Sequence, residues 1–269
     1  MYAFKYQRAE SLEAAAASLA AAPQAKLLAG GQSLIAAMKL RLADSGEIID
    51  LGKIKELSGI SVEGNTVTIG AMTRHAEVAA SAAVRAAIPA LAALAGGIAD
   101  RMVRNMGTIG GSVANNDPAA DYPAGLLALG ATVITNRRRI AADEFFTGLF
   151  ETALEAGEII TAVSFPVPAR AAYMKFKNPA SRFAIVGVFV AKLGAEQGGG
   201  VRVAVTGAAP VVFRVTAMEQ ALAGSFTPEA IANIVVPEDG LNSDIHAQAD
   251  HRAHLITVMA MRAVEVASK

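Results

Sequence analysis

The 269-residue chain contains no cysteine, so it can form no disulfide and has no thiolate with which to ligate an iron–sulfur cluster. It also has no excess of either charge, because Lys plus Arg and Asp plus Glu each number 24. Binding to nucleic acid or to an anionic membrane surface therefore has no electrostatic basis. The one basic run, Arg137 to Arg139, is explained by a solvated turn after a strand.

Long apolar runs are also lacking. The longest run without charge spans residues 122–136, contains Pro123, Gly125 and Gly130, and is shorter than the ~18 apolar residues that a membrane helix needs. Hydrophobic residues still make up 53% of the chain, so we assign the apolar excess to a core and a subunit interface. The first residues lack the regions of a signal peptide, which predicts a cytoplasmic protein without a transmembrane segment.

Residues 104–121 concentrate glycine, hydroxyl, amide and carboxylate groups more densely than any other part of the chain. Gly110 and Gly111 lack a Cβ atom, so the backbone there can adopt positive φ and let a ligand approach its N–H groups. Thr108 and Ser112 add hydroxyl donors, and Asp121 can accept a hydrogen bond from a sugar hydroxyl. This pattern predicts a pyrophosphate site, although glycine pairs also occur in ordinary turns.

A second glycine pair strengthens this interpretation. Residues 26–29 form a short apolar run that leads into Gly30 and Gly31, followed by Gln32 and Ser33. Two such loops can hold two phosphates. Neither has the lysine of a phosphate loop or the Gly-x-Gly-x-x-Gly pattern of a Rossmann dehydrogenase, so the site belongs to a different fold.

The expected elements indicate an α+β protein, because strands and helices do not alternate regularly. Ser11 caps an alanine-rich helix that ends near Pro23. A hairpin is expected over residues 60–69, where alternating apolar residues flank a Gly-Asn turn. The prolines of residues 166–168 favour extended chain and mark a boundary.

This boundary divides the chain into domains of residues 1–168 and 169–269. The second domain is expected to contain four strands followed by three helices. One helix begins after Thr227 with Pro228 at its first position, and the last runs from about Asp244.

The sequence gives little support for a metal centre or for the catalytic site of a serine hydrolase. His251 and His254 are spaced to share a metal on the last helix, but no third ligand is evident. The Gly-x-Ser-x-Gly motif of serine hydrolases is absent.

Taken together, the motifs resemble the FAD-binding medium subunit of the molybdenum hydroxylases, the family of carbon monoxide dehydrogenase and xanthine dehydrogenase. The resemblance rests on Ala29 to Leu34, Met38 to Arg41, Arg104 to Gly111 and Asn116 to Asp121. It implies a two-part FAD-binding domain of the PCMH and vanillyl-alcohol-oxidase type, followed by a small C-terminal domain with an antiparallel sheet and helices. It also implies FAD as cofactor, with molybdenum cofactor and iron–sulfur clusters in partner subunits.

By the same resemblance, two loops would bind the FAD pyrophosphate, Asp121 would bond an FAD hydroxyl, and Ile160 and Lys177 would lie near the isoalloxazine ring. A cation such as Lys177 would stabilise reduced anionic flavin, although a surface lysine on a strand is the ordinary alternative. Phe183 departs from the family, since the carbon monoxide dehydrogenase branch has a tyrosine at the comparable place. The loop residues are Ala29, Gly30, Gly31, Gln32 and Ser33 in the first loop and Thr108, Ile109, Gly110, Gly111 and Ser112 in the second.

The resemblance predicts an electron-transfer flavoprotein that works with a small iron–sulfur subunit and a large molybdenum subunit, as a dimer of heterotrimers. Two alternatives remain: a self-sufficient FAD-dependent oxidoreductase, and a flavin-binding assembly module without catalytic activity. The sequence does not determine the substrate or the electron acceptor.

Overall fold

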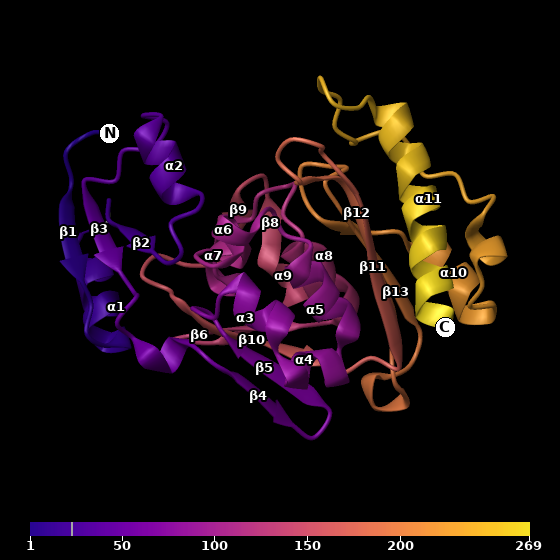
Figure 1. Cartoon of the computed structure of the whole chain (residues 1–269), viewed down its shortest axis with the longest axis horizontal. Coiled ribbons are helices and arrows are strands. Elements are labelled where there is room, and N and C mark those ends of the chain that lie inside the picture. Colours follow the sequence, from indigo (N-terminus) through magenta and orange to yellow (C-terminus); the bar gives the residue numbers. More distant parts are fainter. Residues whose placement is uncertain (23) are drawn as a thin grey trace.

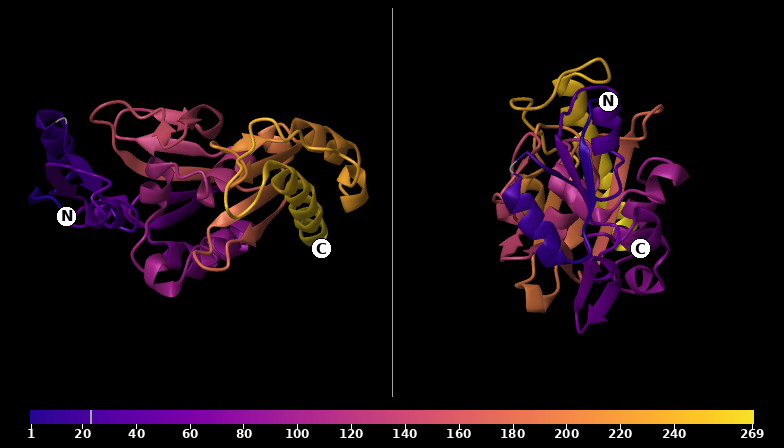
Figure 2. Two further views of the ribbon diagram at one scale, coloured as in Figure 1. Left: turned by 90° about the horizontal axis from the view of Figure 1, so that it is seen from above. Right: turned by 90° about the vertical axis from the view of Figure 1, so that its left-hand side faces the viewer.

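A computed structural model describes residues 1–22 and 24–269. Its secondary structure combines four sheets with helices that cover their faces, which confirms the predicted α+β class. The N-terminal elements lie at one end of the molecule and the C-terminal elements at the other (Figure 2). No helix within the described residues is long and apolar enough to cross a membrane.

The N-terminal lobe is a small parallel sheet with two helices. Its strand order is β1-β3-β2, and both pairs are parallel. Helix α1 begins after Ser11, whose hydroxyl accepts from the N–H of Ala14, as the sequence predicts. It ends at Ala21, and the expected helix end near Pro23 lies outside the described residues. The elements are β1 (Lys5–Arg8), α1 (Leu12–Ala21), β2 (Lys26–Leu28), α2 (Leu34–Lys39), β3 (Glu47–Asp50) and the 3-10 turn η1 (Lys55–Leu57).

The central part is built on an antiparallel sheet of order β4-β5-β10-β6-β7. The predicted hairpin is confirmed: β4 and β5 pair about a turn in which Gly64 has a φ of +56°. The long strand β10 comes from much later in the chain and inserts between β5 and β6, where its apolar side chains join the core. The strands are β4 (Ile60–Glu63), β5 (Thr66–Gly70), β6 (Thr132–Thr135), β7 (Arg139–Ala141) and β10 (Ile160–Pro166).

Short helices pack against this sheet (Figure 1). All eight residues of α8 are buried, because α8 lies between the central part and the C-terminal sheet. The helices are α3 (His75–Ala80), α4 (Ala82–Ala87), α5 (Pro89–Gly96), α6 (Arg101–Arg104), α7 (Ile109–Asn115), α8 (Tyr122–Leu129) and α9 (Ala142–Phe145), and the small hairpin is β8 (Phe146–Gly148) with β9 (Glu151–Thr152).

The C-terminal part is an antiparallel sheet of order β11-β12-β13-β14, covered by α11 on the face away from α8 (Figure 1). Its central strand β12 is buried on both faces, which is why it reads as a nearly continuous apolar run. The elements are β11 (Arg170–Lys177), β12 (Ala184–Lys192), η2 (Ala195–Gln197), β13 (Val201–Thr206), β14 (Phe213–Arg214), α10 (Thr216–Gly224), η3 (Pro228–Ile231) and α11 (Ala249–Ser268).

Two helix predictions in this part were wrong in extent. The segment after Thr227 forms only the 3-10 turn η3. The last helix begins at Ala249 instead of about Asp244, because the Asp244 carboxylate accepts from the N–H groups of His246 and Ala247 and so holds a turn.

Candidate functional site

A cleft of about 670 Å³ opens between the N-terminal lobe and the central part of the molecule. Its lining includes the turn from β2 to α2, the start of α7, the approach to β10, and residues 181–183. The structure thereby brings together most of the residues that the sequence singles out. These are Ala29, Gly30, Gly31, Gln32, Ser33, Thr108, Gly110, Gly111, Ser112, Asp121 and Ile160. The side chain of Ile109 is instead buried in the core, and Lys177 is not among the lining residues.

The turn from β2 to α2 supplies backbone donors. Gly31 has a φ of +71°, a conformation that glycine adopts readily, and it bends the chain from strand into helix. No described residue accepts a hydrogen bond from the backbone N–H of Gly30, Gly31, Gln32 or Ser33. Consecutive free N–H groups at a turn of this kind form a concave site suited to an anion.

The start of α7 is built differently. Thr108 caps the helix, and its hydroxyl accepts from the N–H of Gly111 at 3.2 Å. The N–H groups of Ile109 and Gly110 donate to the carbonyls of Thr73 and Ala71 at 3.1 and 2.8 Å. Because these donors are already used, the groups that this segment can offer a ligand are its hydroxyls.

The expectation of positive φ at Gly110 and Gly111 was wrong, since both residues are helical. Glycine is required there by packing. A Cβ atom on Gly110 would lie 2.5 Å from the Cβ of Ala71, and one on Gly111 would lie 2.9 Å from Oγ1 of Thr108 and 3.4 Å from the Cβ of Ala29. The second glycine pair therefore lets α7 approach both β5 and the first loop.

Asp121 is a buried carboxylate on the cleft wall. Its Oδ1 accepts from the Tyr173 hydroxyl at 2.5 Å and pairs with Nζ of Lys175 at 2.9 Å. Burial raises the pKa of Asp121, and the charge of Lys175 and the Tyr173 hydroxyl oppose that rise. No described residue bonds Oδ2, so one oxygen remains available to a ligand hydroxyl.

The sequence singled out Lys177 for a place near the isoalloxazine ring, and this stays a prediction. The cation that the structure places at Asp121 is a different residue, Lys175. Tyr173 and Lys175 are two residues apart on β11 and so point to the same side of the sheet. A register shift in the pairing of β11 with β12 between Phe176 and Lys177 breaks this alternation, and Lys177 is exposed. The signal that would have identified Lys175 is its two-residue spacing from a tyrosine.

His75 is a further cleft residue that sequence reasoning missed. Its side chain is buried, and burial, followed by the nearby charge of Arg104, lowers its pKa to about 4. The imidazole is therefore neutral near pH 7. Its ring lies 5.4 Å from that of Tyr122, measured between centroids, and neither Nδ1 of His75 nor the Tyr122 hydroxyl has a partner among the described residues.

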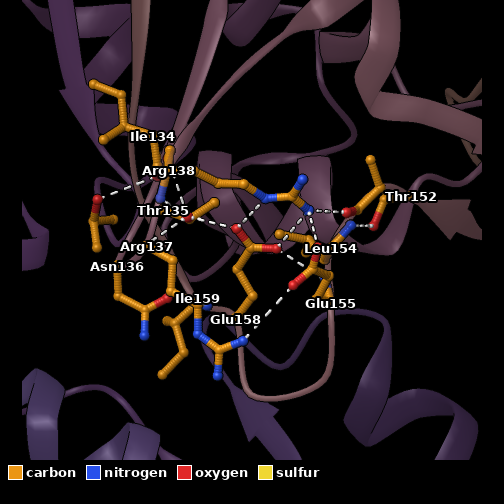
Figure 3. Close-up of polar contacts among 12 residues, drawn as sticks. Ile134, Thr135, Asn136, Arg137, Arg138, Thr152, Leu154, Glu155, Glu158 and Ile159 are labelled. Carbon is orange, nitrogen blue, oxygen red and sulfur yellow. Dashed lines mark hydrogen bonds and ion pairs between the residues drawn. The ribbon is translucent and has the colours of Figure 1, made fainter.

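The wall that leads into β10 is held by a buried carboxylate, Glu158 (Figure 3). Its Oε1 accepts from Nε of Arg138 at 3.0 Å and from the Thr135 hydroxyl at 2.7 Å, while Oε2 accepts from Nη2 of Arg138 and from the N–H of Glu155. Arg138, burial and the other donors together place the pKa of Glu158 at about 2, with Arg138 the largest cause of the lowering. This network fixes the segment that carries Ile159 and Ile160.

Known protein families match almost the whole length of the chain. Residues 2–168 match the family described as FAD binding domain in molybdopterin dehydrogenase, and residues 171–267 match the CO dehydrogenase flavoprotein C-terminal domain. The carbon monoxide dehydrogenase medium chain of Hydrogenophaga pseudoflava is 37% identical over 98% of this chain and 96% of that protein. The glyceraldehyde dehydrogenase medium chain of Sulfolobus acidocaldarius is 33% identical over 97% of this chain and 96% of that protein.

A solved structure of the Hydrogenophaga pseudoflava carbon monoxide dehydrogenase superposes with a TM-score of 0.90, covering 99% of this chain and 98% of that one. The chain therefore belongs to the FAD-binding medium subunits of the molybdenum hydroxylases, as the sequence motifs predict, and it is an oxidoreductase subunit whose cofactor is FAD.

Proposed function

We propose that this chain receives electrons from a partner iron–sulfur subunit into FAD held in the cleft, and delivers them to an external acceptor. The observation that carries the proposal is the cleft itself, which joins two glycine pairs far apart in the sequence, free backbone donors and a buried carboxylate. Bound FAD would supply the chemistry, since a flavin accepts two electrons and can release them singly.

The residues of the cleft fit this cofactor. The free N–H groups of residues 30–33 suit the pyrophosphate, and the hydroxyls of Thr108 and Ser112 can add donors to it. Asp121 retains one carboxylate oxygen for a hydroxyl of the ligand. Ile159 and Ile160 give the wall near β10 an apolar surface against which a planar ring can pack. The cleft volume lies within the range of ligand pockets.

The chain's own side chains would bind and orient the cofactor without proton transfer of their own. His75 is neutral near pH 7 and buried, and Asp121 is paired with Lys175. Within the described residues, no group of His, Asp and Glu side chains is arranged to hold a metal ion. On this proposal the chain binds FAD through residues 1–168, and residues 169–269 form its C-terminal domain.

Partner subunits would supply the remaining redox centres. The chain has no cysteine with which to ligate an iron–sulfur cluster, and its relatives are named medium chains, a term that implies larger and smaller companions. We extend this to a small iron–sulfur subunit, a large molybdenum subunit, a dimer of such heterotrimers and a cytoplasmic location. The relatives' names include both carbon monoxide and glyceraldehyde dehydrogenases, so the substrate does not follow from the likeness.

The test is to purify the full-length chain alone and measure two activities. We expect a flavin absorption spectrum, reduction of that flavin by an artificial donor such as dithionite, and no turnover of carbon monoxide, aldehydes, purines or N-heterocycles. A pull-down from the source organism should recover a cysteine-rich small chain and a large chain. Robust turnover of an organic substrate by the isolated chain would instead favour the self-sufficient flavoenzyme, and flavin that artificial donors cannot reduce would favour the assembly module.

A further inference from the structure

Lys175 does not line the cleft, yet it joins two segments that do. Its side chain is 8% exposed, and Nζ lies within hydrogen-bond distance of three oxygens. These are Oδ1 of Asp121 at 2.9 Å, the carbonyl of Gly97 at 2.9 Å and the carbonyl of Arg182 at 3.0 Å. An ammonium group has three protons, so all of its donors are used.

The carbonyl of Arg182 belongs to the rim of the cleft, which we define as residues 181–183. Arg182 has a φ of +64°, a conformation that is costly for a side chain of this size and persists only where its surroundings hold it. Besides Lys175, the restraints on Arg182 are its N–H bond to the carbonyl of Asn178 and its guanidinium bond to the carbonyl of Ala99 at 3.3 Å.

Lys175 also restrains a second segment at the cleft, residues 97–99. Gly97 ends α5, and Ala99, two residues later, has a φ of +40°. The Arg104 guanidinium donates to the carbonyls of Ile98 and Ala99 at 2.7 and 2.9 Å. Ile98 and Ala99 line the cleft together with the rim. Lys175 therefore bonds Gly97 beside one lining segment, Arg182 in the rim, and the Asp121 carboxylate.

The rim is also held by the N–H of Asn178, which donates to the carbonyl of Phe183 at 2.8 Å. We propose that Lys175 is a positioning residue that locks the cleft rim to Asp121, so that its loss loosens Phe183 over the cleft and removes the cationic partner of Asp121. Phe183 follows Arg182 directly, is 48% exposed, and lines the cleft. The inference rests on the proposed function only where it concerns FAD, because the lock is a property of the protein itself.

Two separate effects follow from losing Lys175. The rim loses its bond at the Arg182 carbonyl, so Phe183 gains mobility. Asp121 loses its cationic partner and becomes a buried carboxylate held only by the Tyr173 hydroxyl, which destabilises the fold. Removing the charge of Asp121 as well should correct the second effect and leave the first.

The chain contains no tryptophan, so Phe183→Trp introduces a single fluorescent reporter on the rim. In that background we would compare Lys175→Met, Asp121→Asn, the double variant, and the control Lys192→Met, a lysine at the far end of β12. Acrylamide quenching and anisotropy without FAD report rim mobility, urea unfolding reports stability, and titration with FAD reports affinity.

We expect Lys175→Met and the double variant to raise the acrylamide quenching constant about twofold, because the surface segment has lost its hydrogen bond to Lys175 and becomes more mobile. Asp121→Asn and Lys192→Met should leave it unchanged, because Lys175 still bonds the rim in both. The double variant should regain most of the stability lost in Lys175→Met. FAD affinity should fall about tenfold wherever Asp121 is uncharged or unpaired, the loss expected for one charge-assisted hydrogen bond.

Equal quenching in Lys175→Met, the double variant and the Lys192→Met control would overturn the inference. If Lys175→Met failed to fold, the double variant would carry the test, since it leaves no unpaired buried carboxylate. If the reporter protein and the wild type bound no FAD while the double variant still loosened the rim, the proposed function would fail and the lock would stand.

Discussion

Gly30 packs against the backbone carbonyl of Met106 so closely that no side-chain carbon fits between them. This contact joins the first glycine turn to the segment that leads into the second, although the two are far apart in the chain. The glycines of this site therefore make room for each other's backbones as well as for a ligand.

Gly111→Val should abolish FAD binding while the chain stays folded. A branched side chain at this position would meet Oγ1 of Thr108 and the Cβ of Ala29, and so would push the two loops apart. Overpacking of this kind costs about 1 to 3 kcal/mol, which a protein of this size can tolerate. The flavin content of the purified variant, measured by absorbance, checks the prediction. Gly96→Ala is the matched control, because a Cβ there meets only Ala79 at an ordinary 3.8 Å. Wild-type flavin content in Gly111→Val would exclude this loop from the site.

The flavin should be held without a covalent bond. The chain has no cysteine, and His75, the histidine among the cleft-lining residues, is buried with Nδ1 enclosed by protein. Precipitation with trichloroacetic acid should leave all of the yellow colour in the supernatant. Flavin that stayed with the pellet would contradict this expectation.

Glu158→Ala should destabilise the protein and weaken FAD binding, because it leaves the N–H of Glu155 without its acceptor and the guanidinium of Arg138 without its carboxylate partner. The Thr135 hydroxyl loses the nearer of its two acceptors and keeps the Arg138 carbonyl at 3.1 Å. We expect a loss of about 1 to 3 kcal/mol, since Arg138 is 42% exposed and solvent screens the ion pair. Urea unfolding of Glu158→Ala and of Glu155→Ala measures it. Glu155 contacts the same arginine but is 64% exposed, so its removal should have little effect. Equal losses in the two variants would refute the role of burial.

The same carboxylate gives stability an acid limit. Its pKa is about 2 in the folded chain and 4.5 ordinarily, so its contribution is complete above about pH 4.5 and is lost as the pH falls towards 2. In Glu158→Gln, the free energy of unfolding should change less with pH over that range than it does in the wild type. If the unfolding free energy of the variant still fell steeply with pH, other groups would be the cause of the acid limit.

His75 should make the protein lose stability on acidification at a higher pH than Glu158 does. Its pKa falls from 6.5 to about 4 on folding, so the unfolded chain binds a proton first, and stability decreases as the pH drops from about 6.5 to 4. The effect is at most about 3 kcal/mol, by the conversion of a pKa shift into free energy. His75→Gln should remove this slope in urea unfolding at a series of pH values, and His254→Gln, an exposed histidine on α11, should retain it. An unchanged slope in His75→Gln would show that folding does not lower the pKa of His75 and that other groups cause the slope.

The sequence alone determined those features that depend on local chemistry. The Gly64-Asn65 turn produced the hairpin of β4 and β5, Ser11 capped α1, and the two glycine pairs marked two segments that line the cleft, because each of these requires a particular residue over a few positions. The family followed from the same motifs, since their residues and order are specific to it.

The tertiary structure decided what those residues do. It placed Gly110 and Gly111 in a helix packed on Ala71, where the sequence suggested a turn with positive φ. It paired Asp121 with Lys175, and it left Lys177 exposed beyond a register shift that interrupts the alternation of side chains on β11. The neutral state of His75 and the low pKa of Glu158 arise from burial and from partners distant in the chain, which no local pattern encodes.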